Sequence, residues 1–584
     1  MDTTPSHASA DPGTDERPFD ADVAVVGYGP AGMAAAALLA QQGHSVVVLE
    51  RYSGMYNLPR AAIFDDETMR TLDKLGLSED LLPTLHVQRN YEWVNGSGQM
   101  LLEHTFSPRG RSGWAEWYMM YQPYLEEAMD GACRATGRVD VRHSSPVHHL
   151  VQDASGVTLT VGGPVDPDGP SGPDGPSGPD GPGGPGGPDG RATSEVRARW
   201  VLACDGGNST VRRFLGVEQD DYGFSEPWMV CDFRFTREGV DVPTARQVGN
   251  PAQPVSIISL GPKHHRFSFM LDSEEEFATE REEAKVWQRV KRFLTPDDAD
   301  LIRVATYTFV SRIAHRWRTG RVLLVGDAAH QMPPFLGQGM CSGIRDAQNL
   351  AFKLDLLLRE QDGARAGVLL DTYQTEREPH VRAVVEKAIE LGRIQALRDP
   401  VAAAERDERM LAARAADEEP QQMRFPGLVD GLLSPRASAG RGELFVQGHV
   451  DAGGGAARFD EVAGRGTVLL LDRDARAALA DGMVDTLVAS GVVVATVARG
   501  AAAGAGDELV DVDGIYDEWF AGHGACAVAV RPDFYVYGTA DDPGTASELA
   551  QEVLADLARP AADRAPSPGD VAFATVPRTA GVPA

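Results

Sequence analysis

The chain has 584 residues, of which 42% are hydrophobic, and a formal net charge of −30 at pH 7. This length predicts several globular domains, while the acidic balance argues against nucleic acid and anionic membranes as partners. No run approaches the roughly 18 apolar residues that a membrane helix needs, and the five scattered cysteines lack metal-site spacing. We therefore expect a cytoplasmic protein without a metal. Residues 1–19 lack the regions of a signal peptide and are predicted to be a disordered tail.

The first predicted unit is a strand followed by a glycine turn and an alanine-rich helix. Gly27, Gly29 and Gly32 form a G-x-G-x-x-G pattern, and Glu50 ends the next strand 18 residues after Gly32. The three glycines serve a tight turn, the approach of a pyrophosphate and helix packing, and the acidic residue accepts a ribose hydroxyl. This setting predicts a dinucleotide site, and a glycine turn without a ligand is the less favoured alternative.

A polar loop then brings Arg60 and three carboxylates, Asp65, Asp66 and Glu67, to a helix start. Carboxylates in a first turn are often caps. For Asp65 a cap and a functional group are equally favoured, whereas capping is preferred for its two neighbours. Gln122 follows an aromatic cluster and opens another predicted helix.

Further strands are predicted over residues 139–143, 157–161 and 196–203, interrupted by a Gly/Pro-rich insertion at 162–190. Glycine recurs there at every third position from Gly169, as in collagen. The repeat is short, so a disordered hairpin insertion is preferred to a trimerising segment.

A second Asp-Gly pair, Asp205 and Gly206, follows a strand and precedes Ser209 and Arg212 at a helix start. Such donors suit a phosphate-bearing ligand. Residues 216–310 then alternate as strands of a mixed sheet, which we predict to be a substrate wall.

Residues 320–353 read as a strand ending in Gly326 and Asp327, a proline-broken crossing, and a glycine turn that opens a helix. Ligands gather at the carboxyl ends of strands in α/β sheets, so Asp327 is predicted to accept a sugar-type hydroxyl. The turn, Gly337–Gly339, lets backbone approach a ligand, and the helix N-terminus favours negative charge. A solvated aspartate on a generic loop is the alternative.

The C-terminal residues form their own unit. A connector over 396–440 is predicted to be helical, and residues 441–560 follow a β-α-β then hairpin-helix order that predicts a thioredoxin-like domain. It has no CxxC motif, so dithiol chemistry is excluded and Cys526 is assigned to packing or oligomerisation. Residues 561–584 are a predicted disordered tail.

Together, the motifs at Gly27–Glu50, Cys204–Arg212 and Gly326–Gly339 resemble those of the single-component FAD-dependent aromatic hydroxylases. The segments LPRAAIFDDETMRTL, YQPYLE, EPWMVCDF and VAVRPDFYVYG resemble the 3-(3-hydroxyphenyl)propionate hydroxylase branch. The resemblance covers residues 20 to about 560 outside the insertion.

The resemblance implies an α/β fold with three parts. They are a Rossmann-like FAD-binding domain of the p-hydroxybenzoate hydroxylase type over residues 20–85, 112–215 and 303–395, a mixed-sheet substrate domain over 86–111 and 216–302, and the thioredoxin-like domain. In this family FAD is bound non-covalently, NADPH or NADH docks transiently, and a flavin C4a-hydroperoxide delivers one oxygen atom.

The resemblance also implies site residues. The cofactor-binding set is Gly27, Gly29, Pro30, Ala31, Gly32, Glu50, Arg51, Arg60, Gln122, Asp205, Gly206, Gly326, Asp327, Pro334, Gly337, Gln338, Gly339 and Met340. Asp65 is proposed as the base or phenol-orienting group, and Pro334 flanks the isoalloxazine. Arg266, Phe267 and Phe269 are candidates for the substrate wall.

The expected reaction is ortho-hydroxylation of a phenolic acid, with 3-(3-hydroxyphenyl)propionate as the first choice, to a catechol with NAD(P)H and O2. A tailoring hydroxylase of a larger aromatic natural product is the alternative, and a flavin-binding scaffold without turnover is less favoured. A flavin-dependent halogenase would carry a GWxWxIP signature, which is missing. Whether the protein is a homodimer stays open.

Overall fold

The computed structural model describes residues 17–162, 193–360, 365–418, 425–498 and 508–558. The predicted Gly/Pro-rich insertion and the two predicted tails lie almost entirely outside these ranges. None of the helices in the described part of the chain has the length and apolar character needed to cross a lipid bilayer.

The N-terminal glycine turn belongs to an eight-stranded sheet whose central strands are parallel. Strand order is β17-β18-β11-β1-β2-β8, with β10 and β9 folded back on β11. The strands are β1 (Ala21–Val26), β2 (Val46–Leu49), β8 (Val139–Arg142), β9 (Val147–Gln152), β10 (Val157–Val161), β11 (Ser194–Ala203), β17 (Arg318–Thr319) and β18 (Val322–Leu324). Strands β2 and β18 are wholly apolar, and β1 and β11 end in apolar runs, because these segments are buried on both faces of the sheet.

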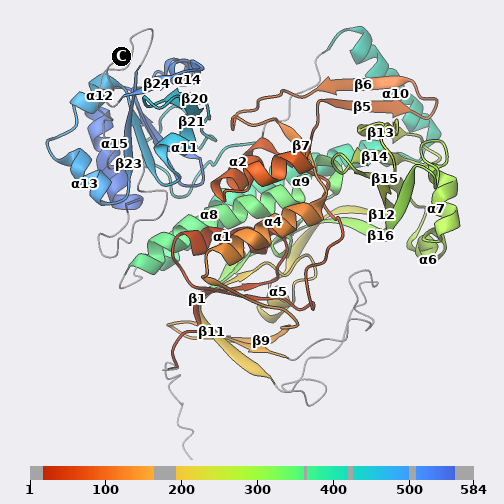
Figure 1. Cartoon of the computed structure of the whole chain (residues 1–584), viewed down its shortest axis with the longest axis horizontal. Helices are drawn as coiled ribbons and strands as arrows, with labels where there is room; N and C mark the ends of the chain where they lie inside the picture. The colour runs from red at the N-terminus through yellow and green to blue at the C-terminus, as the bar shows by residue number, and fades with distance from the viewer. Residues whose placement is uncertain (1–16, 163–192, 361–364, 419–424, 499–507, 559–584) are drawn as a thin grey trace, which may run out of the picture.

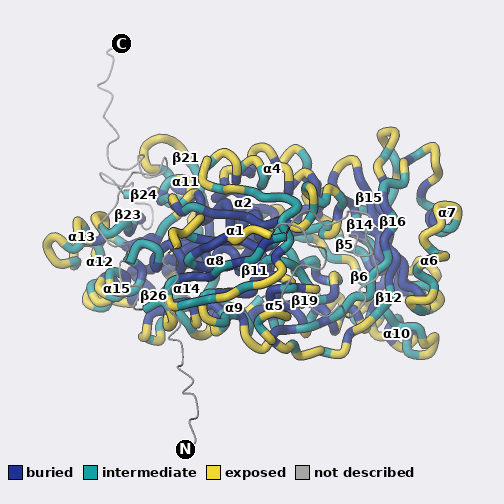
Figure 2. The backbone as a smooth tube through the Cα atoms, turned by 90° about the horizontal axis from the view of Figure 1, so that it is seen from below, coloured by how far each residue is buried: buried dark blue, intermediate teal, exposed yellow. Residues whose placement is uncertain are grey.

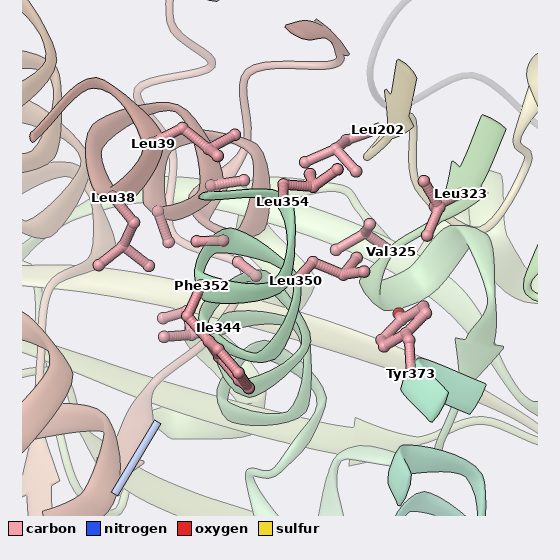
Figure 3. Close-up of a cluster of buried hydrophobic side chains, with 14 of the residues drawn as sticks. Leu38, Leu39, Leu202, Leu323, Val325, Ile344, Leu350, Phe352, Leu354 and Tyr373 are labelled. Atoms are coloured by element: carbon pink, nitrogen blue, oxygen red, sulfur yellow. The ribbon is translucent and has the colours of Figure 1, made fainter. Parts of the chain in front are cut away.

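Helices cover one face of this sheet as a layer across the middle of the molecule (Figure 1). They are α1 (Pro30–Gln41), α2 (Asp66–Lys74), α4 (Gln122–Ala135), α8 (Gly339–Arg359) and α9 (Ala366–Gln395). Leucines of α1 and α8 meet strand residues and Tyr373 of α9 in one buried cluster (Figure 3). Exposed residues concentrate on outer turns and peripheral helices (Figure 2).

A second eight-stranded sheet forms the predicted mixed-sheet region, with order β19-β16-β12-β15-β14-β13-β5-β6. The strands are β5 (Asn90–Asn95), β6 (Met100–Thr105), β12 (Gln219–Phe235), β13 (Ala245–Gly249), β14 (Val255–Ser259), β15 (His264–Met270), β16 (Ala299–Ala314) and β19 (His330–Gln331). The predicted domain boundary at residue 303 falls inside β16. This 16-residue strand pairs with the 17-residue β12 along most of its length, so the two regions share continuous strands.

Shorter elements join the two sheets. A three-stranded sheet holds β3 (Ile63–Asp65), β7 (Trp117–Met119) and β4 (His86–Val87), and α3 (Ser78–Leu81) and α5 (Thr210–Phe214) are single turns. Helix α7 (Glu283–Val290) covers the outer face of the mixed sheet. In the predicted helical connector, α10 spans Pro400–Ala415, and the described residues from 425 to 440 form turns and bends, so that prediction holds only for its first half.

The C-terminal domain has a seven-stranded sheet with order β21-β20-β24-β23-β22-β25-β26. Its elements are β20 (His449–Asp451), β21 (Ala456–Arg458), α11 (Phe459–Ala463), β22 (Val468–Leu471), α12 (Arg473–Ala477), α13 (Met483–Ala489), β23 (Val493–Ala498), β24 (Leu509–Asp511), α14 (Ile515–His523), β25 (Ala527–Val530), β26 (Val536–Ala540) and α15 (Pro543–Asp556). Strand β22 is parallel to β23 and antiparallel to β25, which pairs antiparallel with β26. This arrangement confirms the predicted thioredoxin-like fold.

Buried charges attach the C-terminal domain to the helical layer. Arg70 of α2 donates two hydrogen bonds to Asp460, at 2.6 and 2.7 Å. Arg531 lies 2.7 Å from Glu376 of α9, which also accepts from Lys353 at 2.8 Å. Because unpaired buried charges are costly, these pairs strongly favour the docked arrangement over a separated one.

Candidate active site

A cavity of about 1670 Å³ lies where the parallel sheet, the mixed sheet and the C-terminal domain meet. The start of α1, the loop before β3, the end of β18 and the turn that opens α8 line one side, and the mixed sheet lines another. The predicted cofactor residues in its lining are Gly29, Pro30, Ala31, Arg60, Gln122, Gly206, Gly326, Asp327, Pro334, Gly337, Gly339 and Met340. The predicted residues outside its lining are Gly27, Gly32, Glu50, Arg51, Asp205 and Gln338.

The glycine turn between β1 and α1 has two positions that admit no side chain. Gly27 has a φ of +97°, and a Cβ there would lie 2.5 Å from the carbonyl oxygen of Cys204. A Cβ on Gly32 would lie 2.2 Å from the carbonyl oxygen of Gly27. Gly29 differs, because a Cβ there would meet no atom within 4 Å. Its open side faces the cavity, which leaves room for a ligand to approach the backbone.

Glu50 lies at the end of β2, as predicted, but its carboxylate has backbone partners. It accepts hydrogen bonds from the amide of Tyr28 at 2.7 Å and from that of Tyr52 at 2.9 Å. Arg51 points to Tyr52, with its guanidinium carbon 4.7 Å from the ring centre. Glu50 therefore shapes the turn in this structure, and its contact with a ribose stays a prediction.

Asp327 is the exposed residue in the otherwise buried run from Val322 to His330, and it faces the cavity. Its carboxylate makes no hydrogen bond or ion pair within the described ranges. Its accessible surface faces the cavity, and the protein atoms that surround the cavity raise the pKa of Asp327, while His330 and Arg60 work in the opposite direction. An unpartnered carboxylate at a strand end is suited to accept hydroxyl groups from a bound ligand.

The turn that opens α8 brings backbone close to the same cavity. Gly337 has a φ of +61°, and a Cβ there would lie 2.1 Å from the side chain of Ile63. Gln338 is the N-cap and Gly339 begins a helix of 21 residues. The amides of the first turn of a helix favour negative charge, so this end of the cavity can stabilise an anion.

Arg345 of α8 connects this turn to α2. Its guanidinium forms ion pairs with Asp65 and with Glu67, the latter at 2.6 Å, and donates to the side-chain oxygen of Gln338 at 2.9 Å. Gln338 in turn donates to Asp65 at 3.0 Å, and the hydroxyl of Tyr535 donates to Glu67 at 3.0 Å. The N-terminus of α8 is therefore fixed by charges from α2 and by a hydroxyl from the C-terminal domain.

These contacts do not support the predicted role of Asp65 as a base. Asp65 is the N-cap of α2 and accepts from the amide of Thr68 at 2.9 Å. Burial works to raise its pKa, but Arg345 and the bonds from Thr68 and Gln338 keep that pKa below its ordinary value. A carboxylate held ionised by a guanidinium is a weak proton acceptor, so the capping alternative fits the geometry. The catalytic role stays a prediction.

The side chains of Gln122 and Arg266 hold the loop before β3. Gln122 accepts from the amides of Arg60 and Ala61, at 2.8 and 2.6 Å. Arg266 lines the cavity, but its guanidinium pairs with Asp232 at 2.6 Å and donates to the carbonyl oxygens of Pro59 and Arg60. Arg266 therefore positions the cavity edge, and its place in the lining agrees with the predicted substrate wall, while its contact with a substrate stays a prediction.

The predicted wall residues Phe267 and Phe269 lie on the wrong face of the sheet for that role. They pack against α7 in a separate buried cluster with Val286 and Val290. Successive side chains of a strand point to opposite faces, so Arg266 and Ser268 face the cavity while the two phenylalanines face away.

The Asp205 motif is also used structurally. Its carboxylate accepts from the Ser209 hydroxyl at 2.5 Å and from the amide of Val211 at 3.0 Å. Burial raises the pKa of Asp205, and these bonds oppose the rise. Arg212 donates to the carbonyl oxygens of Ala328 and Gly207, at 2.8 Å each, and its role as a phosphate donor stays a prediction.

Sequence reasoning missed the aromatic and polar side chains of the mixed sheet that face the cavity. They include Tyr91, Trp93, Trp228, Gln247, Ser256, Arg303, Tyr307 and Phe309. The alternation of each strand was a usable signal, but it does not tell which face is the cavity face. The C-terminal domain adds Leu444, Val446 and Tyr535.

Asp66 gives the cavity a pH-sensitive carboxyl. Burial and the neighbouring Asp65 raise its pKa to about 7, although the amide of Ser112 donates to it at 2.8 Å. In the unfolded chain the group titrates near 3.8, so the folded protein retains a proton that the unfolded chain has lost. The stability from this group is complete below about pH 4 and disappears as the pH rises through about 7.

We expect Asp66→Asn to remove this slope, because an amide has no proton to lose. Between about pH 5 and about pH 8, the thermal midpoint of the unmodified protein should therefore fall more steeply than that of the variant. Thermal unfolding followed by circular dichroism checks this, with the exposed Asp481→Asn as control. Parallel midpoint curves for the two variants would contradict the assignment.

Comparison with known proteins identifies two families in the chain. The family described as FAD binding domain matches residues 20–172 and 183–388. The HcaD C-terminal domain matches residues 442–556.

Individual relatives cover almost the whole chain. A probable NADH-specific resorcinol 4-hydroxylase of Rhodococcus jostii (strain RHA1) is 48% identical over 94% of this chain and 97% of its own. A 3-(3-hydroxy-phenyl)propionate/3-hydroxycinnamic acid hydroxylase of Mycobacterium sp. (strain JLS) is 30% identical over 90% of each. The crystal structure of the flavin-dependent monooxygenase PieE with FAD and substrate covers 93% of this chain and 100% of that chain. Its TM-score is 0.73 and its identity 22%, a likeness of fold.

Proposed function

We propose that this chain, which belongs to the family of single-component FAD-dependent aromatic hydroxylases, acts on a small neutral phenol with a second polar group in the meta position. Resorcinol is the reference compound. The chain is an FAD-dependent enzyme that hydroxylates phenolic rings with a nicotinamide cofactor. One O2, one NAD(P)H and one proton are consumed, and the hydroxylated ring, water and NAD(P)⁺ are formed.

FAD fits the residues around the cavity, and three of their features support the proposal. The open side of Gly29 and the first turn of α1 are suited to the pyrophosphate. The unpartnered carboxylate of Asp327 is suited to the ribityl hydroxyls. Pro334 and Gly337–Met340 are assigned to the isoalloxazine, where the N-terminus of α8 favours negative charge. When bound, FAD supplies the redox chemistry that takes hydride from NADH or NADPH and activates O2.

The protein's own contribution is to orient the ring and exclude water. Trp228, Phe309 and Phe335 form an aromatic wall, with ring centres 5.7 to 6.3 Å apart. Such a wall holds a flat ring in one plane and keeps bulk water from the reacting atoms. A phenol reacts best as its hydroxyl group loses its proton. The orientation in which the ring is held determines which carbon is hydroxylated.

The partners of two cations on the mixed sheet support a substrate without a carboxylate. Arg266 and Arg303, the guanidinium groups on its cavity face, both contact Asp232, and both donate to the carbonyl oxygen of Pro59. A substrate carboxylate would have to compete with these partners. This observation, with the 48% identity to a relative named for resorcinol, favours a neutral phenol. The relatives named for 3-(3-hydroxyphenyl)propionate keep the predicted phenolic acid as the second candidate. A larger natural-product substrate has less support.

The test is oxidation of NADH and of NADPH by the FAD-loaded protein in air with resorcinol, phenol and 3-(3-hydroxyphenyl)propionate. We expect resorcinol to stimulate oxidation most and to give one product with one added oxygen atom, detected by mass spectrometry. Product from the phenolic acid alone would reverse the substrate assignment. Formation of peroxide without a hydroxylated product from any of the three compounds would contradict the proposed function.

A further inference from the structure

A row of aromatic side chains lines a part of the cavity to which the proposed function assigns no ligand. It consists of His104 of β6, Phe106 directly after that strand, and Trp117 of β7. The ring centres of His104 and Phe106 are 4.7 Å apart, and those of Phe106 and Trp117 are 5.7 Å apart. All three residues are half-buried, so each leaves part of its surface to the cavity. Such rings are suited to stack on the flat heterocycles of a ligand.

The aromatic row leads to the turn that opens α8. Trp117 is in register with Asp65 across the antiparallel pair of β7 and β3. Two residues further along β7, which is about 7 Å by the rise of a strand, Met119 is in register with Ile63. Ile63 contacts the turn, because a Cβ on Gly337 would lie 2.1 Å from its side chain. The inner end of the row therefore lies next to the place assigned to the isoalloxazine.

The shape of the row indicates a ligand longer than one ring. The aromatic wall that holds the phenol belongs to β12, β16 and the segment before α8, so a phenol bound there leaves the row on β6 and β7 free. A dinucleotide has two sugars and a pyrophosphate between its two bases, and it can extend along the row from the turn outward. The nicotinamide cofactor is the dinucleotide that the reaction consumes, and its ring must reach the isoalloxazine.

An arginine beside the row supplies an open positive charge. The carbonyl oxygen of Arg89 accepts a hydrogen bond from the amide of Phe106 at 2.8 Å, which places the two residues side by side. Arg89 is exposed, lines the cavity, and makes no ion pair within the part of the chain that the structure describes. In a chain of net charge −30, an unpaired guanidinium next to aromatic rings is suited to a pyrophosphate.

The other charges near the row are balanced or negative. Arg111 also lines the cavity, but it pairs with Glu443 of the C-terminal domain at 2.5 Å. Glu116 directly precedes Trp117, and its carboxylate accepts from the amide of Ser107 at 2.6 Å. Enzymes that use NADPH place an arginine at the 2′-phosphate, whereas a carboxylate accompanies the free ribose hydroxyl of NADH. With Arg89 used for the pyrophosphate, this balance favours NADH.

We propose that the aromatic row is the docking site of NADH. The adenine stacks on His104 and Phe106, Arg89 binds the pyrophosphate, and the nicotinamide lies at the inner end beside the turn that opens α8. The carboxylate of Glu116 disfavours the additional phosphate of NADPH. This inference rests on the proposed function, because the proposed function supplies the place of the isoalloxazine.

The test uses the FAD-loaded protein and tetrahydro-NADH, an analogue that cannot donate a hydride, so that binding is measured without turnover. Arg89→Gln and Phe106→Leu should each raise the dissociation constant of this analogue, measured by titration calorimetry, about 5- to 10-fold. The dissociation constant of resorcinol should not change. The matched control is Arg138→Gln, which replaces an exposed arginine outside the cavity lining and should leave both dissociation constants unchanged.

Glu116→Gln tests the selection between the two cofactors. It should reduce the preference for tetrahydro-NADH over tetrahydro-NADPH, because it removes a negative charge near the additional phosphate. An unchanged preference overturns this role of Glu116.

The binding data also separate the alternatives for the row. If Arg89→Gln and Phe106→Leu bind the analogue as tightly as the control does, the docking site lies elsewhere and the inference fails. Weakened resorcinol binding with unchanged binding of the analogue would also overturn it, because the row would then serve the phenol. Analogue binding that depends on Arg89, without a hydroxylated product from any phenol, supports the inference and counts against the proposed function alone.

Discussion

Replacing Arg345 by methionine is expected to lower the free energy of unfolding by about 3–5 kcal/mol, because it removes one partner of a buried ion pair. Arg345, Asp65 and Glu67 are 5%, 5% and 6% exposed. Without the guanidinium, two carboxylates would remain close together with little water around them. The same change removes a donor to Gln338, so the start of α8 should lose its fixed position and the purified protein should retain less FAD.

Chemical unfolding of Arg345→Met, together with the ratio of flavin to protein absorbance, measures both effects. Adding Asp65→Asn and Glu67→Gln should recover part of the lost stability, because the neutral amides need no cation. The control is Arg234→Met, which removes an exposed pair with Asp300 and should leave the unfolding midpoint almost unchanged. An Arg345→Met midpoint equal to that of the control would show that the network contributes little.

A valine at position 29 is expected to separate folding from cofactor binding. Gly29 has φ −85° and ψ −179°, which any residue adopts, and a Cβ there meets no protein atom within 4 Å. The fold should therefore tolerate Gly29→Val. A bound pyrophosphate would meet the new side chain, so FAD affinity should fall about 10- to 100-fold, equivalent to about 1.4–2.8 kcal/mol.

Flavin fluorescence titration of the apoprotein measures this affinity, and the thermal midpoint without FAD tests the fold. Gly131→Ala in α4 is the matched control, since its Cβ also meets nothing within 4 Å and it lies outside the cavity lining. Gly32→Ala should behave differently from both, because its Cβ would clash with Gly27 and disturb the turn itself. If Gly29→Val binds FAD as tightly as the control, the pyrophosphate does not lie at this turn.

Local patterns were sufficient to predict much of the architecture. The spacing from Gly27 to Glu50 predicts a β-α-β unit, because the turn has no room for a side chain at Gly27 and Gly32. The structure has β1, α1 and β2 in those places. The order of elements after residue 441 likewise predicts the thioredoxin-like domain. The family resemblance is confirmed by the matches to the FAD binding domain and to the named hydroxylases.

The parts that escaped prediction depend on pairings between distant residues. Strand β5 joins the mixed sheet through β13, about 150 residues later in the chain, and only that pairing brings Trp93 next to Gln247. The local sequence is equally compatible with Asp65 as a helix cap or as a base. Only the fold shows that Arg345, 280 residues away in the chain, forms an ion pair with it. Phe267 and Phe269 were assigned to the wrong side because alternation fixes which residues share a face, not which face is inside.

Tyr535 and Leu444 have a broader consequence, since they make the last quarter of the chain part of the lining of the candidate active-site cavity. A protein shortened before residue 441 would not be a smaller version of the same catalyst. The cavity would be open on the side that the C-terminal domain covers, and Glu376, which also pairs with Lys353, would lose its ion-pair partner Arg531. An exchange of the C-terminal domain between relatives must therefore transfer its ion-pair partners together with the residues that it contributes to the cavity lining.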